Sequence, residues 1–168
     1  TPKTMPKDGV VLFVDPQRMP QGSGVDIQGT VRTGNFTLKT VGEHPITSGI
    51  NAESVFVSKV TSITVNDDYE ILLTCFKEPA LVVKNEPTSK VAVMAFELQN
   101  SDLSLLLAFP KLFFQTFGYF FPYTVQDYNF EVGEKVTVNS RASELKVSGQ
   151  GVNLTLTNLP AELTLSNY

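Results

Sequence analysis

The pattern of hydrophobic and polar positions in the first part of the chain predicts β-strands. The run VVLFVDP at 10–16 is continuously apolar and ends at Asp-Pro, which indicates a strand buried on both faces. The stretch 25–41 alternates between apolar and polar residues on either side of TGN at 33–35, and this predicts a hairpin with its turn at TGN. The stretch 54–65 alternates in the same way and predicts a further strand.

Three more strands are predicted at 67–76, 79–85 and 90–98. The sequences KEP and EPTSK that separate them are short and turn-like. Strands joined by such short connections are antiparallel neighbours, because a parallel pair needs a crossover of about a dozen residues or more. We therefore expect an antiparallel meander in this part of the chain.

The sequence SDLSLLLAFPKLFFQTFGYFFP at 101–122 has three alternative interpretations: a membrane-spanning helix, an aromatic cofactor site or a buried helix. A span needs about 20 apolar residues, and Lys111 near the middle of this one would cost about 2.5–3.5 kcal/mol. Pro110 would interrupt such a helix, whereas proline is favoured at a first helical position. We therefore favour a buried helix that begins near Phe109 or Pro110 and is stopped by Pro122.

The predicted helix has one narrow polar stripe, made by Lys111, Gln115 and Gly118. Apolar residues cover most of its remaining surface; they are Leu112, Phe113, Phe117, Phe120 and Phe121. A helix that is apolar over so wide an arc is expected to be buried on more than one side. The polar stripe is then expected to form its solvent-exposed edge.

Beyond Pro122 the sequence changes to short alternating strands with turn residues about every eight to twelve positions, which is the spacing of β-sandwich domains. Too few strands are predicted there to close a sandwich. The predicted fold class is therefore α+β and strand-rich: a mixed or antiparallel sheet with one buried helix, followed by the start of a β-sandwich-like unit. We place the domain boundary so that the first segment is 1–122 and the second is 123–168.

Composition and charge limit the classes of function. Of the 168 residues, 42% are hydrophobic and 18% are charged, as in an ordinary globular protein. The net charge is -4 and the lysines and arginines are scattered, so nucleic acid is not expected as a partner. The sequence starts TPKTMPKDG and stops within an alternating pattern, and we therefore expect it to be a segment of a longer protein.

His44 and Cys75 are the only histidine and the only cysteine of the chain. A general base is one interpretation of His44, but a lone loop histidine before proline is more often structural. Cys75 lacks the flanking glycines of a nucleophile elbow and sits within a predicted strand, so we interpret it as an ordinary thiol. Zinc would need several such ligands. We predict no catalytic residue, no cofactor site and no metal site.

Other patterns are weaker. Gly22, Gly24 and Gly29 form a glycine-rich stretch, but it does not open a helix and no Lys-Ser or Lys-Thr follows, so we do not expect a phosphate site. The acidic residues are isolated in predicted turns and are not expected to form a catalytic pair. NFT at Asn35 and NLT at Asn153 match the glycosylation pattern, which matters only in a secreted eukaryotic protein.

The stretch KVAVMAFELQNSDLSLLLAFPKLFFQTFGYF resembles a segment of bacterial Bat-type (aerotolerance-operon-like) proteins, which are membrane-anchored and carry von Willebrand factor A domains. In that family a strand of pattern R/K-V-x-V-x-x-F-D/E-L is followed by D-S-D-L-P-L, then by x-A-F-P-x-L and a helix. This chain has the strand at 90–98, NSDLSL at 100–105 and LAFPKLF at 107–113. PKTMPKDGVVLFVDP and EHPITSGI are similar to two further motifs of the family.

The resemblance covers residues 2–121 and implies a degenerate class I glutamine-amidotransferase-like α/β fold, whose missing half would lie before Thr1, followed by a β-sandwich. Asn100 and Ser104 depart from the family's usual Asp and Pro. The D-x-S-x-S metal motif of the von Willebrand domain and the catalytic Cys-His-Glu set of true amidotransferases are absent from the sequence. Neither a metal role nor a catalytic role therefore carries over from the resemblance.

Together these features favour a non-catalytic scaffold or protein-interaction segment of a larger, membrane-anchored bacterial envelope protein, on the extracytoplasmic side. The expected partners are proteins, and no enzyme activity is expected. Two alternatives stay open. The segment could belong to an amidotransferase-like hydrolase completed by a preceding half, or it could be a glycan-binding, adhesin-type β module with Tyr123 and Tyr128 as an aromatic platform.

Overall fold

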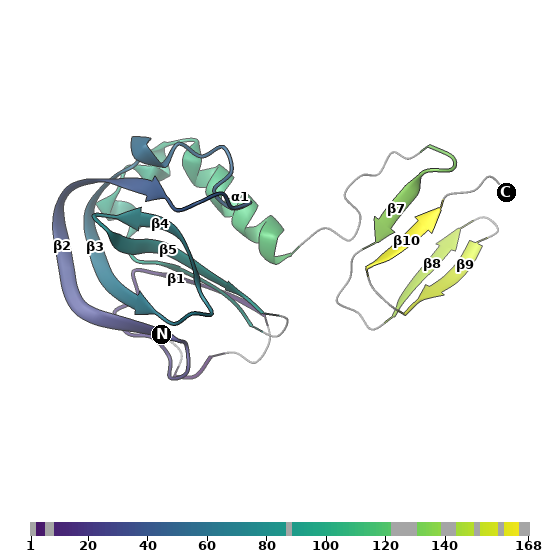
Figure 1. The fold of residues 1–168 in the computed structure, drawn as a ribbon, viewed down its shortest axis with the longest axis horizontal. Helices are drawn as coiled ribbons and strands as arrows, with labels where there is room; N and C mark the ends of the chain where they lie inside the picture. The colour runs from purple at the N-terminus through teal and green to yellow at the C-terminus, as the bar shows by residue number, and fades with distance from the viewer. Residues whose placement is uncertain are drawn as a thin grey trace. The chain divides into compact units, whose positions relative to one another are not determined.

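The computed structural model describes residues 3–5, 9–86, 89–121, 131–138, 144–149, 152–157 and 160–164. The chain forms two compact units, Thr1–Phe120 and Phe121–Tyr168. The first unit contains a six-stranded sheet and the helix α1, and the second contains two small two-stranded sheets (Figure 1). The predicted fold class, α+β and strand-rich with one helix, is confirmed.

The sheet of the first unit is mixed, and its strand order is β1-β6-β5-β4-β2-β3. Its strands are β1 (Val10–Val14), β2 (Val25–Thr40), β3 (Phe56–Val65), β4 (Glu70–Cys75), β5 (Glu78–Asn85) and β6 (Lys90–Met94). β1 pairs with β6 in parallel, whereas all other pairs are antiparallel. The predicted meander is present as β4, β5 and β6, which are consecutive neighbours in the sheet.

The β4–β5 connection is a two-residue hairpin turn made by Phe76 and Lys77. Both residues have positive φ, at 49° and 68°, and Cys75 pairs with Glu78 across the turn. Two successive positive φ values match the right-handed twist of the flanking strands, which is why such turns are favoured in hairpins. The exposed ring of Phe76 packs on Phe36 of β2 with 4.9 Å between ring centroids.

The hairpin predicted at 25–41 is wrong, because β2 runs as one 16-residue strand through TGN. The glycines mark bulges instead of a turn. The register against β3 shifts between Ile27 and Val31, around Gly29 with its φ of +68°, and shifts again between Thr33 and Phe36, around Gly34. Gly34 also leaves room for the Phe36 ring, whose nearest carbon lies 2.6 Å from where a Cβ atom would be.

The bulges let β2 curve, so that its first part pairs with β3 and its last residues pair with β4. The sheet therefore curls (Figure 1). The outer edge of β3 then meets the segment that follows β6: Thr61 N donates to Ala95 O at 2.8 Å, and Asp102 N donates to Phe56 O at 3.1 Å. Short 3-10 helices occupy the connections; they are η1 (Ala52–Ser54), η2 (Leu98–Asn100) and η3 (Leu103–Leu105).

β1 is present where it was predicted, but the expectation that both of its faces are buried is wrong. Only Phe13 is fully buried, and Val14 is 42% exposed. The reason is position: β1 lies at the edge of the sheet, with β6 as its one strand neighbour among the described residues. The core instead lies in the central strands, and β6 is buried along its whole length.

The helix α1 (Ala108–Phe120) begins one residue before the predicted start. Its last residue agrees with the predicted stop, although Pro122 itself lies outside the described residues. No helix in the described part of the chain is long and apolar enough to cross a membrane. The predicted helix is therefore confirmed.

α1 is buried against the sheet along one stripe, but the expectation that apolar residues on more than one side of it are buried is wrong. The buried residues are Leu112, Thr116 and Phe120, which form one stripe at a spacing of four, whereas Phe114 and Phe117 are 67% and 52% exposed. The helix packs on the sheet through this stripe, and its Phe114 and Phe117 side is left largely uncovered by the described residues.

The polar stripe is not a free solvent edge either. Lys111 Nζ donates to Gly49 O at 2.8 Å and Gln115 Nε2 donates to Ser48 O at 3.1 Å, so both side chains hold the loop that follows β2. The helix thus turns its polar stripe to a loop and leaves phenylalanines exposed.

The second unit consists of short strands, as the alternating pattern beyond Pro122 predicts. They are β7 (Lys135–Val138), β8 (Leu145–Gly149), β9 (Val152–Leu156) and β10 (Ala161–Thr164). β10 pairs with β7 and β8 pairs with β9, both in antiparallel fashion. Val136 and Val138 are the buried hydrophobic residues among those described there, as expected for alternate positions of one strand.

Candidate functional site

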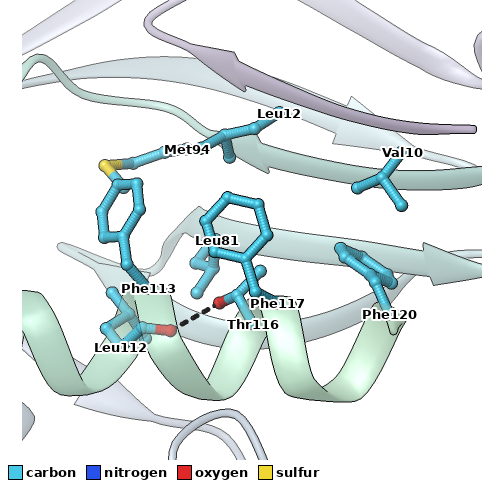
Figure 2. A pocket seen from close by; sticks show the side chains of 9 residues that line it. All are labelled: Val10, Leu12, Leu81, Met94, Leu112, Phe113, Thr116, Phe117 and Phe120. Atoms are coloured by element: carbon cyan, nitrogen blue, oxygen red, sulfur yellow. Dashed lines mark hydrogen bonds between the residues drawn. The ribbon is translucent and has the colours of Figure 1, made fainter. Parts of the chain in front are cut away.

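The most distinctive surface of the first unit lies where α1 packs across β1, β5 and β6. A small cavity of about 20 Å³ lies between the helix and the sheet (Figure 2). Its lining is apolar apart from one threonine and consists of Val10, Leu12, Leu81, Met94, Leu112, Phe113, Thr116, Phe117 and Phe120. The Thr116 hydroxyl donates to Leu112 O at 2.7 Å and is thereby satisfied within the helix. A cavity of this size could just hold one water molecule, but the lining offers it too few polar partners, so we infer that it is dry.

Phe113 and Phe117 lie on the outer side of this cavity. Phe113 packs on Phe109 with 4.7 Å between ring centroids, and Figure 2 shows Phe113 beside Met94 and Phe117 extending toward the sheet. Phe117 is still more than half exposed, so its ring covers the cavity from the solvent side. The two rings therefore separate the apolar interior from water without any further layer of described residues above them.

Four large hydrophobic side chains within α1 or just before it are exposed. Leu105 and Leu107, just before α1, are 85% and 89% exposed, and Phe114 lies between them and Phe117 in the sequence. We call Leu105, Leu107, Phe114 and Phe117 the α1 apolar surface. Burial of one such side chain stabilises a complex or a fold by roughly 1.5–3 kcal/mol. Phe114 and Phe117 are three residues apart and are therefore neighbours on the helix surface. Exposed hydrophobic side chains that adjoin one another in this way are a candidate interaction site.

The loop beside the helix is fixed by backbone hydrogen bonds. Gly49 has a φ of +62°, and its missing Cβ would lie 2.6 Å from Lys111 Nζ. Glycine is therefore favoured twice here, by the left-handed backbone and by the close approach of the lysine head. The loop and the α1 apolar surface flank an open groove lined by Ile50 and Leu105–Ala108.

Lys90 anchors the other end of α1. Its ammonium group is buried and donates to Phe120 O at 2.6 Å. A positive charge at the carboxyl end of a helix is stabilised by the helix dipole. Lys90 therefore helps to position α1 on the sheet.

His44, the candidate general base, is held in a structural role. Its Nδ1 accepts a hydrogen bond from Ile46 N at 3.1 Å, so the neutral ring carries its proton on Nε2, which lies 3.8 Å from Glu70 Oε2. The ring packs edge-on against Tyr119 of α1 with 4.7 Å between centroids. Burial lowers the pKa of His44 below its ordinary value of 6.5, and the charge of Glu70 opposes this lowering only in part.

Cys75, the candidate nucleophile, is fully buried in β4. Burial raises the pKa of its thiol from 9.0 to about 11. A cysteine reacts as the thiolate, so this thiol is protonated and unreactive at neutral pH. The structure does not bring His44 and Cys75 into hydrogen-bond contact.

Asp15 is a buried charged residue that the sequence analysis treated only as the end of a strand. It adopts a φ of 40°, its Oδ1 accepts from Thr61 Oγ1 at 2.7 Å, and Gln17 Nε2 lies 3.3 Å from Oδ2. A left-handed aspartate is uncommon and indicates a position fixed by its surroundings. The signal in the sequence was the Asp-Pro pair at the end of an apolar run.

The remaining charged and polar patterns stay separate from α1. Asp68 is on the surface and is paired with Lys84 at 3.2 Å. This hydrogen bond holds the pKa of Asp68 below its usual value, as does a second one from Asn66. Asn35 and Asn153 are exposed in strands β2 and β9, whereas Tyr123 and Tyr128 lie outside the described residues.

The acidic, histidine and cysteine side chains are scattered over the described part of the chain. Within the described part of the chain, no group of three or more His, Cys, Asp or Glu side chains could hold a metal ion. The glycine-rich stretch at 22–29 lies in the loop before β2 and in its first residues, beside an open groove. It precedes a strand, so it lacks the helix N-terminus on which phosphate cradles depend.

Comparison with known proteins gives similarity of fold alone. No family model and no curated protein matches the chain. Its fold resembles that of the cytoplasmic protein STM3548 from Salmonella typhimurium, with 15% identity and a TM-score of 0.51 over 67% of this chain and 55% of that one. It also resembles the cytoplasmic protein STM1381 from Salmonella typhimurium LT2, with 11% identity and a TM-score of 0.57 over 67% of this chain and 56% of that one. The matches thus span little more than half the length of either neighbour.

Proposed function

We propose that this chain is a non-catalytic scaffold or protein-interaction segment of a larger, membrane-anchored bacterial envelope protein. The observation that carries the interaction role is the α1 apolar surface, where two leucines and two phenylalanines are each more than half exposed. Protein partners bury such side chains readily, and aromatic residues are enriched in the centres of interfaces. The parentage and the extracytoplasmic location rest on the resemblance to Bat-type proteins.

The side chains that would be needed for catalysis have structural partners, which supports a non-catalytic role. His44 accepts a hydrogen bond from its own loop and packs on Tyr119. The Cys75 thiol is buried, and its pKa of about 11 keeps it protonated at neutral pH. Neither residue is arranged as an activated nucleophile or as its base.

A hydrolysis assay tests the non-catalytic role. The purified chain is expected to hydrolyse glutamine or a simple aryl ester no faster than buffer, and Cys75→Ser and His44→Ala are expected to change nothing in that assay. Turnover above background that disappears in either variant would instead support the amidotransferase-like alternative.

The proposed location is tested separately by fractionation of the source bacterium with an antibody to this chain. Recovery with the membrane fraction, together with digestion by external protease in spheroplasts, is expected. Recovery in the cytosol would contradict the envelope assignment and would agree with the two fold neighbours, both of which are described as cytoplasmic.

A further inference from the structure

The outer edge of β1 presents backbone groups that have no partner strand among the described residues. Lys90 N donates to Gly9 O and Asp15 N donates to Met94 O, with Val10 opposite Lys90 and Val14 opposite Met94. In a parallel ladder the backbone groups of alternate residues face alternate sides. The N–H and C=O groups of Val10, Leu12 and Val14 therefore point away from β6.

This edge lacks the features that usually prevent strands from pairing. Its sequence is VVLFV, without a charge or a proline, and its pairing with β6 continues without a bulge from Val10 to Val14. Protected edges carry lysine, proline or a bulge, whereas a flat apolar edge pairs with another chain. The edge of β1 is thus a template for an added strand.

The α1 apolar surface adjoins the same edge. Val10 and Leu12 of β1 line one cavity together with Phe113 and Phe117 of α1, which places the helix over β1 (Figure 2). Phe120 lies near Val10 and Phe117 lies near Leu12 in that view, so the helix runs antiparallel to the strand. A partner that adds a strand to β1 would therefore also lie close to Phe117. Phe114 is three residues before Phe117 and is thus its neighbour on the exposed surface of the helix.

We propose that a second copy of this chain occupies this position. The two β1 strands pair in antiparallel orientation about a two-fold axis perpendicular to the sheet, and the two α1 helices pack against each other through Phe114 and Phe117. An antiparallel edge is complementary to itself, because every outward residue offers one donor and one acceptor. The segment has no charge to repel its copy. The two-fold axis keeps both helices on one face of the extended sheet. A single dimer contact therefore covers both the edge of β1 and the rings of Phe114 and Phe117.

This inference deepens the proposed interaction role, on which it rests, by naming the partner. The two are tested separately, because a monomeric chain would overturn the self-pairing and leave the hydrolysis assay unaffected. Likewise, a catalytically active dimer would overturn the non-catalytic role and leave the self-pairing intact.

Sedimentation equilibrium of the 168-residue chain tests the proposal. The wild-type protein is expected to form a species of twice the 18.5 kDa chain mass as its concentration rises. Val14→Lys places a charge on the edge of β1, and Phe114→Glu places one on the helix. Each is expected to weaken dimerisation by about tenfold or more, equivalent to about 1.4 kcal/mol.

Val41→Lys is the matched control. Val41 is 44% exposed, compared with 42% for Val14, but it lies beyond β2 and bonds to Leu72 of β4, away from the β1 edge of the sheet. This variant is expected to dimerise as the wild type does, and all three variants are expected to keep the wild-type circular dichroism spectrum. The proposal would be overturned by a monomeric wild type. It would also be overturned if dimerisation were weakened equally in all three variants, or in none of them.

Discussion

At the scale of single residues, Asp15 shows how a buried charge is retained. The carboxylate accepts the Thr61 hydroxyl at 2.7 Å, and its backbone sits at a φ of 40°, where most residues are strained. Asparagine and aspartate adopt this region more readily than other residues with a side chain. Position 15 therefore requires both an acceptor oxygen and a tolerance of left-handed backbone.

Asp15→Ala is expected to destabilise the protein by about 2–3 kcal/mol, since it removes the acceptor and the short polar side chain that makes a left-handed conformation tolerable. Asp15→Asn keeps an acceptor oxygen and the same backbone preference, and is expected to cost no more than about 1 kcal/mol. Urea unfolding of both variants measures the difference. Equal losses would show that the Thr61 hydrogen bond and the backbone do not determine this position.

His44 supplies a prediction about pH. Its folded-state pKa is lowered by burial, so the unfolded chain binds the proton more tightly than the folded chain does. The stability from the neutral ring is fully present above pH 6.5, the ordinary value, and is lost as the pH falls from there through the lowered folded-state pKa. His44→Asn keeps an acceptor for Ile46 N without a titrating ring. Between pH 7 and the lowered pKa, the urea midpoint of this variant should therefore fall less steeply with decreasing pH than that of the wild type. An unchanged slope would contradict the assignment.

At the scale of elements, the positions of strands and of α1 could be predicted because alternation and proline placement are local signals. The course of β2 could not, because a glycine in an alternating segment is equally compatible with a turn and with a bulge. Only the pairing with β3 and β4 decides between these, and pairing is set by distant parts of the chain. The exposed side of α1 was missed for a related reason: the sequence shows that most of the helix surface is apolar, but not which neighbours cover it.

The helix itself gives a direct test of which side is buried. Leu112 is buried against the sheet, so Leu112→Ala is expected to destabilise by about 2–5 kcal/mol. Phe114→Ser, at a mostly exposed position, is expected to change the free energy of unfolding by about 0.5 kcal/mol or less when measured at concentrations where the protein is monomeric. Thermal or urea unfolding provides the measurement. A larger loss for Phe114→Ser would mean that this side of α1 is covered within the monomer.

The contact between the helix and its loop can be isolated with a pair of glycines. Gly49 and Gly42 have nearly the same left-handed φ, +62° and +66°, but only at Gly49 would a Cβ meet Lys111. Gly42→Ala and Gly49→Ala therefore share the backbone cost of about 1–2 kcal/mol. Gly49→Ala should lose about 0.5–1.5 kcal/mol more, because Lys111 must leave Gly49 O. Equal unfolding midpoints for the two variants would show that the Lys111 contact contributes nothing.

At the scale of the whole molecule, the first unit has an asymmetric surface. At one edge of its sheet, β3 is hydrogen-bonded to the segment that follows β6. At the other edge lies β1, an uncharged strand that packs beside α1, whose aromatic side chains are only partly buried. The same packing that makes α1 part of the core on one side leaves Phe114 and Phe117 for a partner on the other. Under the proposed role, these two exposed rings are the contact surface, and neither His44 nor Cys75 takes part in it.

Hydrogen–deuterium exchange of the outward β1 amides, read by NMR across a range of protein concentration, tests most directly that this surface is an interface. The amides of Val10, Leu12 and Val14 should exchange more slowly as the protein concentration rises. The exchange rates of the amides around Val41 should not depend on concentration. Exchange at these three amides that is fast at every concentration would contradict the account.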